Sequence, residues 1–108
     1  MVYKVIIREE ALSDTREAYN YYEQQKTGLG EEFLIALIKR FDDLAEHPTH
    51  YSYIDEQYEK IFRDARIERF PYVVIFEITE KEVIVYAVHH TLKHQRGKPR
   101  KTNPTYLH

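Results

Sequence analysis

The chain contains no cysteine and no tryptophan, and only three of its 108 residues are glycine. Without cysteine it can form neither a disulfide nor a thiolate metal site, and it has no cysteine nucleophile. No stretch approaches the roughly 20 apolar residues that a membrane helix requires. Residues 1–10 also lack the apolar core of a signal peptide. We therefore expect a cytoplasmic protein with no membrane contact.

The residues that are present are typical of one folded domain. Apolar residues make up 43% and charged residues 31% of the chain, which is usual for a globular protein. A chain of this length holds a single hydrophobic core. Tyrosine occurs 10 times, and its apolar ring and polar tip suit both a small core and a partner surface.

Charge is divided unequally between the two halves. Residues 1–59 carry 13 acids and 6 bases, whereas residues 60–108 carry 5 acids and 10 bases. Residues 89–108 contain five bases and no acid. Such asymmetry indicates that the second half faces something anionic. Nucleic acid, an acidic protein and the acidic first half of the same chain all fit this description.

Hydrophobic periodicity predicts an α+β fold with one strand, two helices and then several strands. The predicted helices are 11–26 and 31–46, and the predicted strands are 2–7, 51–54, 60–69, 72–78 and 83–88. About four residues join the helices, so we expect an antiparallel helical hairpin on one face of an antiparallel meander. The near-continuous apolar character of residues 2–7 favours an interior place in the sheet.

Local signals add details to this outline. Asp14 followed by Glu17 resembles a capping box and would start the first helix late. Gly28 is a natural C-cap for that helix, because glycine accepts the left-handed conformation. We assign residues 1–92 to the domain and residues 93–108 to a basic, irregular tail that is rich in helix- and strand-breaking residues.

The pair His89-His90 follows the last predicted strand and is the most specific candidate for chemistry. Histidine can give or take a proton near neutral pH. Neighbouring residues of a strand point to opposite faces, so one of the pair can face a given cleft. The alternative is a histidine that packs or hydrogen-bonds without reacting.

Three arginines form a second candidate site. In a strand, Arg63 and Arg69 would share one face and Arg66 would lie on the other. The planar guanidinium fits phosphate, so this pair and a nearby histidine could hold an RNA phosphate. The histidine would move a proton and an arginine would stabilise charge. The alternative, at least equally favoured for Arg66, is salt bridging to nearby acids.

Metal and cofactor sites are not predicted. Histidines occur close together in two places, but no carboxylate completes a metal-binding pattern such as H-E-x-x-H. The histidines considered were His47, His50, His89, His90 and His94.

Several segments, in order and at family spacing, resemble the RelE/ParE superfamily of type II toxins, also called plasmid stabilisation proteins. They are residues 18–25, 28–34, 47–48, 69–76 and 87–90. The Arg69-Phe70-Pro71-Tyr72 run with the aliphatic-histidine ending looks like the ParE-type branch. The resemblance implies a growth-inhibiting toxin, neutralised by an antitoxin segment that folds on binding.

The resemblance leaves the target open. ParE-like members poison DNA gyrase and have no established hydrolytic site, and we favour this activity. RelE-like members are ribosome-dependent mRNA endonucleases, and a non-toxic binding module is a third reading. For a nuclease, the family pattern would assign catalysis to His90, Arg63 and Arg69. We expect Arg66, His89, Lys93 and Arg96 to bind a partner. Exposed sheet edges would also allow pairing with a second copy of the chain.

Overall fold

The structure is a computed structural model that describes residues 2–55 and 59–93. Strand β1 (Lys4–Ile7) leads into helices α1 (Glu9–Gln25) and α2 (Leu29–Glu46), and a short 3-10 helix, η1 (Pro48–His50), follows. Four strands complete the order: β2 (Tyr53–Asp55), β3 (Glu59–Arg66), β4 (Tyr72–Ile78) and β5 (Glu82–His90). The α+β class and the order of elements predicted from the sequence are confirmed.

The strands form one five-stranded sheet in the order β1-β5-β4-β3-β2. Strands β2 to β5 make the predicted antiparallel meander, whereas β1 pairs parallel with β5, so the sheet is mixed. The expected interior position of the first strand was wrong, because β1 lies at an edge. Its apolar residues are explained by the helical layer: Val5 and Ile7 pack against the core, and the Tyr3 N–H donates to the Ala45 carbonyl at 2.7 Å.

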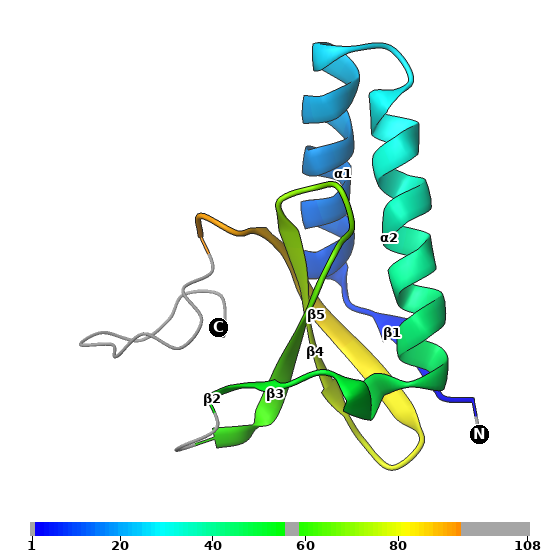
Figure 1. Cartoon of the computed structure of the whole chain (residues 1–108), viewed down its shortest axis with the longest axis vertical. Helices are drawn as coiled ribbons and strands as arrows, with labels where there is room; N and C mark the ends of the chain where they lie inside the picture. The colour runs from blue at the N-terminus through cyan, green and yellow to red at the C-terminus, as the bar shows by residue number, and fades with distance from the viewer. Residues whose placement is uncertain (1, 56–58, 94–108) are drawn as a thin grey trace.

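The helical hairpin covers one face of the sheet, with α1 and α2 side by side (Figure 1). Phe33, Leu37 and Leu44 of α2 are fully buried against strand residues such as Phe76. Ile38 of the same helix is 55% exposed, because it lies at the margin of the apolar face that packs on the sheet.

The junction of the two helices depends on glycine. Gly28 has φ 91° and caps the N-terminus of α2, whereas we expected it to cap the C-terminus of α1. The Glu23 carboxylate accepts hydrogen bonds from the N–H groups of Gly28 and Gly30, both at 3.0 Å. A Cβ at residue 30 would lie 2.8 Å from the Tyr19 carbonyl oxygen. Glycine therefore permits this close approach of the helices.

Helix α1 begins earlier than the capping-box signal suggested. Its N-cap is Arg8, which makes no side-chain capping bond, and Asp14 lies inside the helix. The Asp14 carboxylate instead accepts a hydrogen bond from the Val88 N–H at 3.0 Å. Strand β1 pairs only with residues 82–85 of β5, so it offers no backbone partner to the later residues on that edge of β5. Asp14 of α1 supplies an acceptor for the Val88 N–H instead.

Candidate functional site

Strand β5 carries the histidine pair within it, whereas the sequence placed the pair after the strand. Tyr86 is an extra residue in β5, because Val85 pairs with Phe76 and Ala87 pairs with the preceding residue of β4. Such a bulge shifts the alternation of side chains. Val85 faces the helices, but Ala87 joins a cluster on the opposite side, which we call the outer face. His89 therefore lies on the outer face and His90 on the helix-facing side.

His90 is held by its neighbours on the helix-facing side. Its ring meets the edge of the Tyr72 ring, with 5.2 Å between centroids, and its Nδ1 accepts a hydrogen bond from the Leu92 N–H at 3.0 Å. Because Nδ1 supplies a lone pair, the neutral ring carries its proton on Nε2. To accept a proton at Nε2, the neutral His90 ring would need its own proton on Nδ1 instead. This arrangement therefore favours hydrogen-bond donation from Nε2 over proton abstraction.

His89 lies in a cross-strand row with Val73 of β4 and Arg66 of β3. Its Nε2 is 3.8 Å from Asp14 Oδ2, in the same carboxylate that accepts the Val88 N–H. Two strand spacings separate the Arg66 and His89 backbones by about 10 Å. The outer face therefore brings together two of the residues expected to bind a partner.

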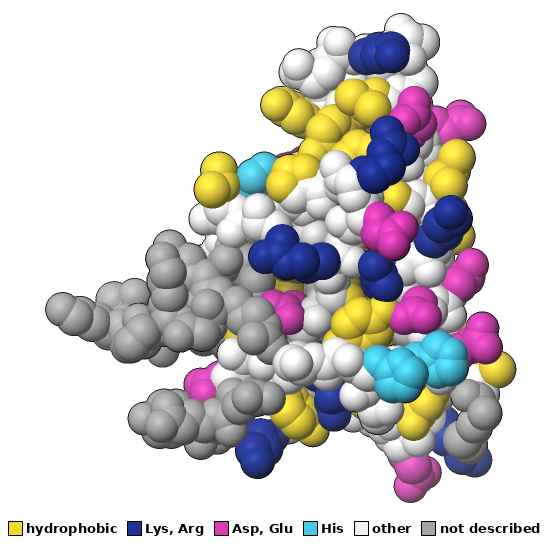
Figure 2. All heavy atoms as spheres, viewed as in Figure 1, with side chains coloured by type: hydrophobic (Ala, Val, Ile, Leu, Met, Phe, Trp, Pro, Cys, Tyr) yellow, Lys and Arg dark blue, Asp and Glu magenta, His cyan; other side chains and the backbone are white. Residues whose placement is uncertain are grey.

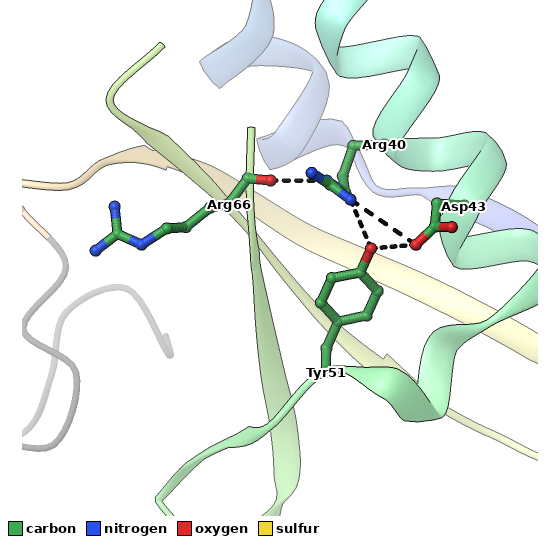
Figure 3. Close-up of polar contacts among 4 residues, drawn as sticks. All are labelled: Arg40, Asp43, Tyr51 and Arg66. Atoms are coloured by element: carbon green, nitrogen blue, oxygen red, sulfur yellow. Dashed lines mark hydrogen bonds and ion pairs between the residues drawn. The ribbon is translucent and has the colours of Figure 1, made fainter. Parts of the chain in front are cut away.

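A polar cluster fixes the backbone at Arg66 (Figure 3). Arg40 of α2 donates from Nε to the Arg66 carbonyl and from Nη1 to the Tyr51 hydroxyl, both at 2.7 Å. The Tyr51 hydroxyl donates in turn to Asp43. Burial and this bond to Asp43 raise the pKa of Tyr51. The cluster ties the end of β3 to α2, while the Arg66 side chain points away from it (Figure 3).

Arg63 holds neighbouring strands together and lies away from His90. Its guanidinium donates to the Tyr51 carbonyl at 2.6 Å and to the Tyr53 hydroxyl at 2.9 Å, and it lies 4.0 Å from the centroid of the Tyr53 ring. Arg63 pairs with Phe76, four positions along β4 from the partner of His90. The two residues are thus about 13 Å apart along the strand direction alone.

Arg69 does not share a strand face with Arg63, which corrects the sequence prediction. Strand β3 ends at Arg66, because Pro71 has no N–H for strand pairing and the chain turns before it. Arg69 lies in this turn with φ 74°. Its Nη2 is 2.9 Å from Glu32 Oε1 on α2, and its side chain is 65% exposed.

The three residues expected to be catalytic are therefore not assembled around one point. Arg69 and His90 lie at the same end of the sheet, where the Thr91 N–H donates to the Pro71 carbonyl at 2.8 Å, but Arg63 is remote from them. Among the expected binding residues, Lys93 is exposed in the turn after β5, and Arg96 lies outside the described residues.

The outer face also carries a group that sequence reasoning missed. The Tyr86 hydroxyl donates to Glu77 Oε1, and the Arg8 guanidinium lies 5.2 Å from the Tyr86 ring centroid. The pKa of Tyr86 is raised mainly by its bond to Glu77 and secondarily by burial. Sequence reasoning could not group these residues, because the grouping depends on which residues of β4 and β5 lie opposite each other.

The histidines at the end of α2 pack against each other. The His47 and His50 rings are stacked, with 4.7 Å between centroids and 4° between planes. Within residues 2–55 and 59–93, no three His, Asp or Glu side chains form a metal-binding group; His94 lies beyond them. No helix in that part of the chain is long and apolar enough to cross a membrane.

Comparison with known proteins links this architecture to a toxin family. The family model described as "ParE toxin of type II toxin-antitoxin system, parDE" matches residues 5–94. No curated protein matches the sequence. Residues 5–94 include all the described elements except the first residue of β1.

Two solved structures share the fold. A chain of the chromosomal ParDE system from P. aeruginosa aligns with a TM-score of 0.71 and 14% identity, covering 82% of this chain and 96% of that chain. A chain of the RelBE2 toxin-antitoxin complex from Mycobacterium tuberculosis aligns with a TM-score of 0.62 and 20% identity, covering 83% and 99%. These alignments support the fold, and the family match extends over most of the sequence. The chain belongs to the ParE toxin family of type II toxin-antitoxin systems.

Proposed function

We propose that this toxin arrests bacterial growth by binding a protein target in the cytoplasm, namely DNA gyrase. The observation that carries the proposal is the separation of Arg63 from Arg69 and His90, the set expected for RNA cleavage. General acid–base chemistry requires its groups within hydrogen-bond reach of one substrate. Arg63 instead bonds to two tyrosines, and the Nδ1 of His90 is occupied by a backbone N–H.

The charge of the sheet region supports a protein target. Residues 60–93 carry six bases and five acids, so this region has little of the positive excess that attracts nucleic acid. Most of the excess in the second half belongs to residues 94–108. A surface of mixed charge that includes tyrosine and arginine is typical of protein–protein interfaces.

We also propose a cognate antitoxin as the partner that neutralises the toxin. Support comes from the family match and from the structural relatives, which are described as a ParDE system and as a RelBE2 toxin-antitoxin complex. Strand β2 lies at the edge of the sheet. An edge strand offers backbone groups to which an added strand can bond.

A second candidate is a ribosome-dependent mRNA endonuclease. The observation in its favour is the outer-face row of Arg66 and His89, with Asp14 beside the histidine. In such a site Arg66 would hold the phosphate and His89 would move a proton. This assignment replaces the Arg63, Arg69 and His90 set with residues that the fold does bring together.

Induced expression in a bacterial host distinguishes the candidates. The proposal predicts growth arrest with gyrase-linked DNA breakage and intact transcripts, unchanged in His89→Ala. Transcript cleavage within translated codons that is lost in His89→Ala, with no DNA breakage, would establish the nuclease instead. His50→Ala serves as the control, because that histidine stacks on His47 after α2 and belongs to neither candidate surface. Continued growth with folded toxin present would contradict both and leave a non-toxic binding module.

A further inference from the structure

Arg69 has an unfavourable backbone conformation. It is the one non-glycine residue with positive φ, 74°, in the part of the chain that the structure describes. Side chains with a Cβ rarely adopt this region, and glycine enters it without steric cost. The turn itself is fixed by backbone bonds, from Ile67 N–H to the Tyr72 carbonyl at 3.0 Å and from Tyr72 N–H to the Phe70 carbonyl at 2.8 Å. Glycine would therefore suit residue 69 better than arginine does.

The contacts of Arg69 within the chain give little compensation. Its ion pair with Glu32 joins side chains that are 65% and 45% exposed, and exposed pairs contribute little stability. Its guanidinium lies 5.3 Å from the Phe70 ring centroid, which is also a weak attraction at an exposed site. A guanidinium has five N–H donors, so this exposed group retains donors for a partner. Arg69 therefore combines an unfavourable backbone conformation, little compensation within the chain and unused hydrogen-bond donors.

Groups suited to a protein partner lie at the same end of the molecule as Arg69. The β3–β4 turn and the end of β5 lie at the same end of the sheet, beside α1 (Figure 1). Tyr21 is 55% exposed and Leu92 is 83% exposed, and Lys93 is exposed beside it. Figure 2 shows hydrophobic side chains around one histidine at this end of the molecule. We call Arg69, Tyr21, His90, Leu92 and Lys93 the tip surface.

Ring contacts connect the tip surface to the core. The ring centroids of Tyr21 and Tyr22 are 5.2 Å apart, and those of Tyr22 and Phe70 are 5.0 Å apart. His90 packs on Tyr72. Arginine and tyrosine are among the residues most enriched in binding hot spots.

The local charges favour an acidic protein segment over nucleic acid. Arg69, Lys93 and the Nε2–H of His90 attract carboxylates as well as phosphates. However, acids also lie close by: the Asp14 carboxylate accepts the Val88 N–H, two residues before His90. Burial, and after it the charges of Tyr21, Glu17 and Asp14, raise the pKa of Tyr72. Glu32 adds a further negative charge beside Arg69. These acids would repel a continuous phosphate backbone, whereas a protein segment can direct one carboxylate at Arg69.

We propose that the tip surface binds an acidic segment of the protein that this toxin inhibits, with Arg69 bonded to a carboxylate and an apolar side chain on Tyr21 and Leu92. The inference rests on the proposed function, in which the target is a protein. It assigns target recognition to the end of the sheet where β5 finishes. The outer-face row of Arg66 and His89 lies at the same end of the sheet, on the opposite face from His90.

The test compares Arg69→Gly with Glu32→Gln in the full-length toxin. For each, the inducer level that halves the growth rate and the urea midpoint of unfolding are measured. Arg69→Gly should unfold at the same or a higher urea concentration and require at least about tenfold more inducer. Glu32→Gln, which removes the ion pair but leaves the arginine, should stay within about twofold of wild type. Leu92→Glu, at an exposed position, should weaken arrest as Arg69→Gly does.

Three results would overturn the inference. The first is normal arrest by both Arg69→Gly and Leu92→Glu. The second is an equal loss in Glu32→Gln, which would make the role of Arg69 structural. The third is weakened binding of single-stranded RNA by Arg69→Gly with arrest unchanged, which would assign the surface to nucleic acid. A folded wild-type chain that does not arrest growth would instead reject the proposed function and this inference with it.

Discussion

Asp14 shows how one side chain can serve two parts of the structure. Its carboxylate accepts the Val88 N–H at the open edge of β5 and lies 3.8 Å from His89 Nε2. The residue comes from α1, 74 positions away from its bonded partner in the sequence. A helix thus completes the hydrogen bonding of the strand that carries the histidine pair.

We predict that Asp14→Ala lowers the free energy of unfolding by about 1–2 kcal/mol. The loss of a bond between a charged group and a backbone N–H costs about 1.5–3 kcal/mol, and the better helix propensity of alanine returns up to about 0.7 kcal/mol. Urea unfolding measures the difference. Asp14→Asn keeps an oxygen acceptor and should lose less. Equal stability of Asp14→Ala and wild type would show that this bond is not needed.

Residue identity alone did not reveal the arrangement at the site. The arginines and histidines were identified from their chemistry, but their grouping depends on where β3 ends and on the bulge at Tyr86. The bond from Arg40 to the Arg66 carbonyl joins residues that are 26 positions apart in the sequence. Because such contacts join segments that are distant in the sequence, local sequence patterns do not predict them.

At the scale of the elements, the tight crossing of α1 and α2 is the most constrained feature. Glu23 bonds to two backbone N–H groups at the start of α2, and residue 30 has no room for a Cβ beside the Tyr19 carbonyl. The helices themselves and strand β4 were predictable, because the periodicity of residues 31–46 and 72–78 is local. The edge position of β1 was not, since strand order depends on long-range pairing.

We predict that Gly30→Ala destabilises the protein by about 1–3 kcal/mol. Alanine favours a helix by roughly 1 kcal/mol over glycine, but the added Cβ would press on backbone at 2.8 Å and force the helices apart. Thermal or urea unfolding would measure this change, with Glu31→Ala on the exposed side of the same turn as control. A Gly30→Ala variant that is as stable as the control would contradict this account of the junction.

Across the whole molecule, partly buried tyrosines pack around a core whose buried aromatic residues are phenylalanines. The pKa values of Tyr22, Tyr51 and Tyr72 are raised mainly by burial, and that of Tyr86 mainly by its bond to Glu77. A raised pKa means that the folded chain keeps these phenols protonated where the unfolded chain would release the protons. Folding stability is then fully present below the ordinary tyrosine pKa of about 10 and declines as pH rises above it.

We predict that the urea midpoint falls between about pH 8 and about pH 11. The ultraviolet absorbance of phenolate should show a late-titrating group of tyrosines in the folded protein. Tyr22→Phe should reduce the fall, because its hydroxyl makes no side-chain hydrogen bond that contributes to its shift. A urea midpoint that does not change over this pH range, or a fall that is the same in Tyr22→Phe, would contradict this link between tyrosine protonation and folding stability.

The central claim is that this ParE-family toxin acts on a protein and not on RNA. The most direct measurement adds the purified chain to DNA gyrase and, in parallel, to ribosomes translating a defined mRNA. The account predicts inhibited supercoiling with cleaved DNA held on the enzyme, and an uncut message. Normal gyrase activity together with cleavage of the ribosome-bound message would contradict it.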